Sequence, residues 1–157
     1  MQPVISASPA SPSLKTAVRR LLLAIAILSV AGMVVSAVSL QHHYRKSKTA
    51  YCDIGENFNC DIVNRSEYSS ILGVPVALIG ILGYGTLLAF STLYKTKAET
   101  PAVLLFAAVA GLAFALRLTY IEGFVLYTWC ILCLTSLGLI FSIAALCAFV
   151  FRSSRDS

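Results

Sequence analysis

Residues 124–151 read FVLYTWCILCLTSLGLIFSIAALCAFVF, a stretch without a single charged side chain. A helix rises about 1.5 Å per residue, so a stretch of this length can cross the hydrocarbon layer of a bilayer, which is about 30 Å thick. A strand of a membrane barrel would be about half as long and would alternate in polarity. The stretch therefore predicts a membrane-spanning helix that carries a C-x-x-C motif, Cys130 and Cys133, near one end.

Three more apolar stretches precede this one. The four predicted spans are residues 21–40, 71–94, 101–121 and 124–151. Of the 157 residues, 58% are hydrophobic and 12% are charged, whereas a soluble domain is about a quarter charged. The sequence therefore predicts an all-α membrane protein, a four-transmembrane-helix bundle that forms one domain over residues 21–151. Thr100 is the expected N-cap of the third helix, with Pro101 at its first position.

Basic residues predict the orientation of the bundle. One side of the membrane receives seven of them, namely Lys15, Arg19, Arg20, Lys95, Lys97, Arg152 and Arg155. The positive-inside rule puts this side in the cytoplasm, so residues 1–20 form a mobile cytoplasmic tail and residues 152–157 a second one. The loop 41–70 then lies outside. The net charge of +5 is explained by these clusters, and no basic stripe interleaved with aromatics suggests nucleic-acid binding.

The outer loop 41–70 reads QHHYRKSKTAYCDIGENFNCDIVNRSEYSS and holds a second cysteine pair, Cys52 and Cys60. A short helix over residues 60–65 is expected, with Asn59 as its N-cap. This loop and its helix would cap the bundle between the first and second spans. His42 and His43 are expected to be solvated residues at the membrane interface. A turn is expected near Glu122. Arg117 lies close to the outer end of the third span and could either snorkel outward or pair with Glu122.

Both cysteine pairs fall on the predicted outer, oxidising side. Residues at i and i+3 share one helix face, so Cys130 and Cys133 can close a small reducible ring. A helix N-terminus lowers the pKa of a cysteine thiol, and such thiolates are the better leaving groups in exchange. One pair in an aqueous loop can meet a protein, and one pair at the membrane edge can meet a lipid-soluble oxidant. The cysteines therefore predict a membrane enzyme, a thiol-disulfide oxidoreductase in which electrons pass between the pairs.

Other interpretations of these residues stay open. The pairs could be structural disulfides that pin the loop of a non-catalytic membrane scaffold, or the four sulfurs could bind zinc, although no metal is expected. Cys147 lies about 25 Å along the helix from Cys130, so it is predicted to be a small buried apolar group. The glycines of the second span, Gly73, Gly80, Gly83 and Gly85, suggest close helix packing or room for a flat ring.

A family resemblance rests on the combined pattern. Cys52 and Cys60 flank seven residues, Ser66 follows, the second span opens with Ile-Leu-Gly-Val-Pro at 71–75, and Cys130-Ile-Leu-Cys133 comes last. This pattern resembles the vitamin K epoxide reductase family over residues 20–151, and its second span is most similar to bacterial homologues. The four-span bacterial disulfide oxidases have the opposite order, with C-x-x-C in the first outer loop region.

The resemblance implies a role for each site residue. The family fold is a four-helix bundle around a quinone pocket. Cys52 would accept electrons from a thioredoxin-like protein through a mixed disulfide, and Cys60 would reduce the Cys130–Cys133 disulfide by attacking Cys130. Cys133 would face the quinone, and Ser66 matches a residue that supports the exchange. From their depth near the C-x-x-C motif, the pocket walls are expected to include Phe114, Tyr120, Phe124, Tyr127 and Trp129.

The resemblance also implies the reaction and its setting. The expected function is oxidation of a periplasmic thioredoxin-like protein, a separate chain, with reduction of ubiquinone, menaquinone or vitamin K in the bacterial inner membrane. Disulfide formation in exported proteins would follow. Leu137 replaces a tyrosine, and Ser69 or Ser70 an asparagine, that hydrogen-bond vitamin K oxygens in animal enzymes. Quinone reduction is therefore expected, with vitamin K epoxide reduction as the alternative.

Overall fold

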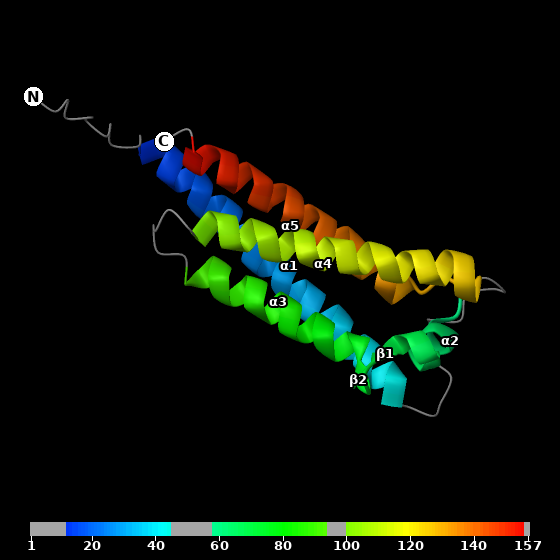
Figure 1. Ribbon diagram of the computed structural model, residues 1–157. Coiled ribbons are helices and arrows are strands. Elements are labelled where there is room, and N and C mark those ends of the chain that lie inside the picture. The colour runs from blue at the N-terminus through cyan, green and yellow to red at the C-terminus, as the bar shows by residue number, and fades with distance from the viewer. Residues whose placement is uncertain (1–11, 45–57, 94–99, 156–157) are drawn as a thin grey trace, which may run out of the picture.

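The computed structural model of the chain describes residues 12–44, 58–93 and 100–155. Within these ranges the long helices are α1 (Pro12–Tyr44), α3 (Val76–Thr92), α4 (Thr100–Ile121) and α5 (Ile131–Arg155). The short elements are α2 (Cys60–Arg65), the 3₁₀ helix η1 (Glu67–Ser69), the strands β1 (Ser70–Ile71) and β2 (Val74–Pro75), and the π-helical segment η2 (Glu122–Leu126). Figure 1 shows the long helices side by side, with α2 and the strands at one end.

Among the described residues, three segments are long and apolar enough to cross a membrane. They are Thr16–Tyr44, Pro101–Leu126 and Ile131–Arg155. The fourth long helix, α3, is also apolar but shorter, with 17 residues. α1 begins at Pro12, earlier than the predicted span, so only residues 1–11 of the predicted mobile tail lie outside the described residues.

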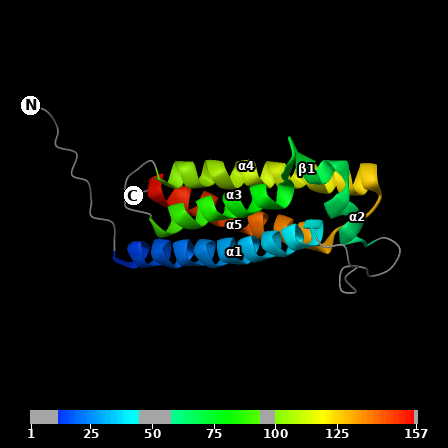
Figure 2. The same cartoon turned by 90° about the horizontal axis from the view of Figure 1, so that it is seen from below.

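Packing is strongest between α1 and α3, between α4 and α5, and between α1 and α5. Figure 2 shows the same arrangement from below, with the N-terminal end of α1 and the C-terminal end of α5 at one end and α2 at the other. Ile25, Leu104, Ile143 and Val150 are fully buried and form the core toward the end opposite α2.

The outward faces of the helices are strongly apolar. Ile27, Phe106, Phe141 and Phe149 each expose more than half of their surface. Apolar side chains on so many sides would be costly in water, whereas they match the hydrocarbon interior of a bilayer. The surface therefore agrees with the membrane-protein class predicted from composition.

The second predicted span begins later than expected. β1 and β2 pair antiparallel and are joined by Leu72 and Gly73, which both have positive φ, at 52° and 81°. Two-residue hairpin turns of this kind need positive φ at both central positions. Helix α3 then starts after Pro75 and not at residue 71.

The fourth predicted span was wrong at its start. Residues 124–126 continue α4 as the π-helical η2, and the chain turns at Tyr127, whose φ is 50°. Helix α5 begins only at Ile131. Apolar composition runs unbroken through this turn, so hydropathy alone could not locate it. The expected turn near Glu122 therefore lies about one helical turn later, and the C-x-x-C motif straddles the start of a helix.

Of the four glycines predicted to allow close helix packing, Gly80 does so and Gly73, Gly83 and Gly85 do not. A Cβ atom on Gly80 would lie 2.7 Å from Ser36 Oγ of α1, whereas at Gly83 and Gly85 it would meet nothing within 4 Å. The tightest site was not singled out from sequence. A Cβ atom on Gly32 would lie 2.3 Å from Cε1 of Tyr84, on the neighbouring helix α3.

Gly32→Ala is expected to destabilise the bundle by about 1–3 kcal/mol, the usual cost of overpacking. The Tyr84 ring cannot easily move away, because its hydroxyl lies 2.9 Å from both the carbonyl oxygen and Oγ of Ser136 on α5. Thermal unfolding in detergent measures the change. Gly138→Ala is the matched control, since its Cβ atom would meet nothing within 4 Å and alanine favours helix. Equal stability of the two variants would contradict the steric argument.

Candidate active site

Backbone pairing brings the outer segment to the C-x-x-C motif. Phe58 and Trp129 form a parallel β-bridge, and the N–H of Asn59 donates to the carbonyl oxygen of Trp129 over 3.2 Å. Cys60 directly follows Asn59, and Cys130 directly follows Trp129. Both are buried, at 1% and 0% exposure. The pairing therefore places the two cysteines together although 70 residues separate them in sequence.

The short helix α2 has the bounds and the cap that the sequence predicted. Oδ1 of Asn59 accepts hydrogen bonds from the N–H groups of Asp61 and Ile62, both at 3.1 Å. These are two of the donors that a helix N-terminus leaves unpaired. The cap fixes the first turn of α2 and, with it, the position of Cys60.

Asn59→Ala is expected to loosen this turn by about 1 kcal/mol, the usual cost of removing a helix cap. In a chain whose other cysteines are alanine, we expect maleimide to alkylate Cys60 about fivefold faster, because local opening exposes the thiol. Asn59→Asp keeps an acceptor oxygen at the cap. In this variant Cys60 should therefore react at the same rate as in the chain that keeps Asn59. If the alanine and aspartate variants react equally fast, the cap does not hold Cys60.

The C-terminal end of α1 holds α2 from the other side. Nδ1 of His42 lies 3.6 Å from Oδ1 of Asp61, and Oγ of Ser39 donates to Oδ1 of Asn64 over 2.7 Å. Nδ1 of His43 donates to the carbonyl oxygen of Asn64. The expectation of solvated histidines was wrong for His42, which is only 2% exposed. Helix α2, which carries Asp61, packs against His42. Hydropathy along the sequence could not reveal this contact.

Cys130 precedes the first residue of α5 and acts as the start of its hydrogen-bond pattern. The N–H of Leu134 donates to the carbonyl oxygen of Cys130 over 3.0 Å. The N–H of Cys130 itself donates to Oε2 of Glu122 over 3.1 Å. Cys133 lies one turn into the helix. Glu122 therefore holds the backbone of Cys130, the motif residue that precedes α5, in place.

Three cysteine side chains meet here, those of Cys60, Cys130 and Cys133. The Cys130 thiol interacts with both of the others, and Cys133 also interacts with Glu122. The hydrogen bond with Cys133 and the burial of the group raise the pKa of Cys130, while Cys60 acts in the opposite direction. The expected lowering by a helix N-terminus is therefore overridden at Cys130. Sulfurs this close can exchange disulfides without a large rearrangement.

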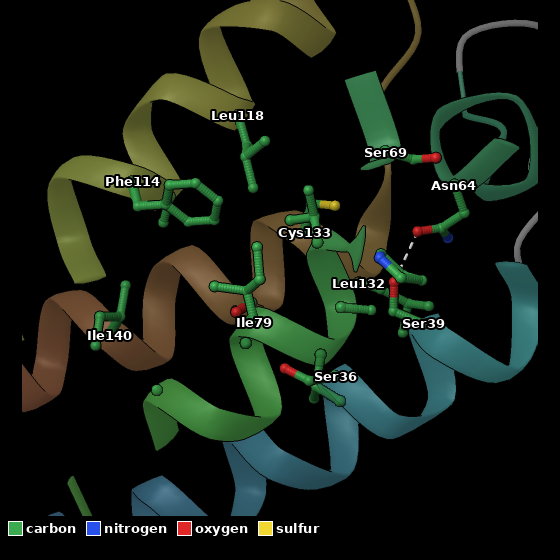
Figure 3. A pocket seen from close by; sticks show the side chains of 18 of the residues that line it. Ser36, Ser39, Asn64, Ser69, Ile79, Phe114, Leu118, Leu132, Cys133 and Ile140 are labelled. Atoms are coloured by element: carbon green, nitrogen blue, oxygen red, sulfur yellow. Dashed lines mark hydrogen bonds between the residues drawn. The ribbon is translucent and has the colours of Figure 1, made fainter. Parts of the chain in front are cut away.

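A cavity of about 340 Å³ opens beside Cys133. This volume lies at the lower end of the range of small-molecule sites, about 300–1,000 Å³. Its polar lining residues are Ser36, Ser39, His43, Asn64, Ser66, Tyr68, Ser69, Tyr84, Glu122, Cys133 and Ser136, and the rest of the lining is apolar. Figure 3 shows Cys133 between Phe114 and Leu118 of α4 on one side and Ser69 and Asn64 on the other.

The structure places the residues that the sequence singled out in different surroundings. Cys60, Cys130 and Cys133 come together, and Ser66 lines the cavity, where its Oγ donates to the carbonyl oxygen of Val63 over 2.8 Å. Cys52 lies outside the described residues. Cys147 is buried in the core at 1% exposure, as predicted. Ser69 lines the cavity, whereas Leu137 is not among its lining residues.

The aromatic walls were largely mispredicted. Phe114 lines the cavity, but Tyr120, Phe124, Tyr127 and Trp129 do not. Tyr120 and Phe124 stack on each other at the surface, with centroids 4.7 Å apart, and Tyr127 is 77% exposed in the turn. All four have the right depth but the wrong face, because an apolar side chain is accommodated equally well by lipid and by protein.

Two polar residues of the cavity were missed. Asn64 is 7% exposed, and its Nδ2 has no hydrogen-bond partner among the described residues; the same holds for Oε1 of Glu122, at 2%. For Glu122 a signal existed, since an acidic residue inside an apolar stretch is a candidate functional group. It was considered only as a partner for Arg117, which is exposed and forms no ion pair in the described part of the chain.

A family comparison agrees with this geometry. The model of the vitamin K epoxide reductase family matches residues 23–148, which include most of each long helix and all three clustered cysteines. The match covers most of the chain. Membership implies an oxidoreductase of the membrane that acts on quinones or their epoxides. The chain belongs to the vitamin K epoxide reductase family.

Proposed function

We propose that the chain is a membrane thiol:quinone oxidoreductase that oxidises a separate thioredoxin-like protein. A dithiol of that protein would become a disulfide, and its two electrons would pass through Cys52 and Cys60 to Cys130 and Cys133. A quinone would take them up and leave as the hydroquinone. The physiological result would be disulfide formation in exported proteins.

One observation carries the proposal: three cysteine side chains meet beside an apolar cavity. Cys60 and Cys130 are buried and in contact, and Cys133 lines the cavity. A thiol–disulfide relay needs neighbouring sulfurs, and a lipid-soluble oxidant needs an apolar site. The same place offers both. A scaffold pinned by disulfides would not need a cavity beside its cysteines.

The polar end of the cavity suits a quinone. Nδ2 of Asn64 is a buried donor with no hydrogen-bond partner among the described residues, and a quinone carbonyl oxygen is an acceptor. Ser39 holds the other side of this amide through the 2.7 Å bond to Oδ1. A buried donor without a partner is costly, and a ligand carbonyl would remove that cost. Ser69 adds a second hydroxyl to the same end.

The membrane arrangement follows from length and charge. α3 spans about 26 Å at 1.5 Å per residue, close to the hydrocarbon thickness, so we infer four spans. Seven basic residues flank the end where α1 begins and α5 ends, and this end would be cytoplasmic. α2 and the thiol cluster would then face the periplasm of a bacterial inner membrane, with outer loop 41–70 exposed to the protein partner.

The test is a quinone-reduction assay. The purified full chain in detergent receives a reduced thioredoxin-like protein and either ubiquinone or menaquinone analogues, and hydroquinone formation is followed optically. Turnover that needs both substrates supports the proposal. No reduction of any quinone, with the chain folded and its thiols titratable, would contradict it. Assays with vitamin K epoxide separate the alternative reaction, and metal analysis of the same preparation tests the zinc interpretation.

A further inference from the structure

Glu122 is a buried acidic residue that the thiol relay leaves unused. Only 2% of its surface is exposed. Oε2 accepts the hydrogen bond from the N–H of Cys130, whereas Oε1 has no hydrogen-bond partner among the described residues. The residue lines the cavity together with Cys133, and its carboxyl group interacts with the Cys133 thiol.

This arrangement is expensive for a purely structural residue. Burial removes the hydration of a carboxyl group, and an unpaired oxygen adds a further cost. No cation pairs with Glu122 in the described ranges. A glutamine would accept the Cys130 N–H bond equally well and would carry no charge. The hydrogen bond to Cys130 therefore does not explain why this residue is an acid. The ability to bind and release a proton is the property that a glutamine would lack.

We propose that Glu122 carries a proton from the Cys133 thiol to the quinone oxygen nearest to it. The inference rests on the proposed function, since it assigns the proton path of the quinone half-reaction. Glu122 touches Cys133, one of the reacting groups, and also borders the space in which the quinone would lie. A carboxylate in this position can take the thiol proton on one side and deliver it on the other.

The step balances in protons and electrons. Cys133 loses its proton to Glu122, and its thiolate adds to a ring carbon of the quinone, so that an S–C bond forms. The Cys130 thiolate then attacks the Cys133 sulfur: the S–S bond of the Cys130–Cys133 disulfide forms, the S–C bond breaks, and its electron pair leaves with the hydroquinone. Glu122 gives its proton to the first quinone oxygen and returns to its starting state. The Cys130 thiol releases its proton to water, and the second quinone oxygen takes one from water as the hydroquinone leaves. Two electrons and two protons have then moved from the dithiol to the quinone.

The other titratable groups that line the cavity are His43, Tyr84 and Tyr68, and half of the surface of Tyr68, on η1, is exposed. Nδ1 of His43, from α1, donates to the carbonyl oxygen of Asn64. The hydroxyl of Tyr84, from α3, lies 2.9 Å from both oxygens of Ser136. The remaining titratable groups facing Glu122 are the reacting thiols of Cys60, Cys130 and Cys133. Of these groups, Glu122 is the buried acid whose Oε1 has no hydrogen-bond partner among the described residues, so this oxygen is available to a ligand.

The experiment compares Glu122→Gln with Glu122→Asp in the full chain. Glutamine keeps an oxygen for the Cys130 N–H and should lower kcat for quinone reduction about 100-fold, with KM for the quinone unchanged, because a positioned acid–base group contributes about 10²–10⁴-fold. Aspartate keeps the acid and should retain about a tenth of the activity. Glu67→Gln is the matched control, since Glu67 is exposed on η1.

The pH profile separates proton transfer from a structural role. In the unsubstituted chain kcat should fall on the acid side, as the carboxylate that must accept the Cys133 proton becomes protonated. Glu122→Gln should lose this limb, and its remaining rate should be flat there. If Glu122→Gln keeps kcat within threefold with the same profile, or if glutamine and aspartate are equally inactive, the inference is overturned. Failure of the unsubstituted chain to reduce any quinone would instead overturn the proposed function.

Discussion

Cys133→Ala is expected to reduce quinone turnover by at least 1,000-fold, to the limit of detection. Cys133 is the thiol of the cluster that lines the cavity, and its removal leaves Cys130 without the partner needed for a disulfide. Cys130→Ala and the double variant should lose the same amount, because groups that act as a unit do not have additive effects. Hydroquinone formation with a reduced protein donor measures the loss.

Cys133→Ala should also change which disulfide forms on oxidation. Without Cys133, oxidation should join Cys60 to Cys130, since these two thiols are already in contact. Peptide mapping without reductant would detect this disulfide. Cys147→Ala is the matched control, because Cys147 is equally buried but lies in the core away from the cluster, and its turnover should stay within threefold. Appreciable turnover by Cys133→Ala would end the relay model.

Cys60→Ala is expected to lower oxidation of the protein donor by at least 100-fold while a small dithiol such as dithiothreitol still supports quinone reduction. Cys60 is the thiol of α2 that touches Cys130, so it links the outer loop to the C-x-x-C motif. A small dithiol can reach the Cys130–Cys133 disulfide without this link, whereas a folded protein cannot enter the bundle. Initial rates with the two donors, measured at the same quinone concentration, give the comparison.

Cys52→Ala provides the parallel measurement, since a relay predicts the same selectivity for either loop cysteine. Asp61→Asn, in the same short helix, serves as a control that keeps every thiol. If Cys60→Ala loses activity with both donors, Cys60 supports the fold of the site rather than the entry of electrons. If it loses activity with neither, electrons from the protein donor enter by another route.

Local features of the site were predictable where local physics controls them. The α2 helix has the predicted bounds over residues 60–65 and the predicted Asn59 cap, because capping depends only on neighbouring backbone N–H groups. The third helix starts at Thr100 and ends at Ile121, close to the expected range. Each of these depends on residues within a few positions of one another.

Features that depend on distant contacts were not predictable. The burial of His42 comes from α2, and the turn at Tyr127 interrupts an apolar stretch that reads as one helix. The aromatic residues near Cys130 were assigned by depth, yet only Phe114 faces the cavity. The orphan atoms of Asn64 and Glu122 could be recognised only after their neighbours were in place.

Hydropathy and cysteine spacing are properties of the chain alone, so the membrane class and the family could be inferred without a structure. Which side chains face the cavity and which face outward depends instead on how the helices pack. In a helix that is apolar on every side, no periodicity distinguishes lipid contact from protein contact. The inward face is fixed only when helices pack, and so the placement of Glu122 beside Cys130 and Cys133 emerged from the fold.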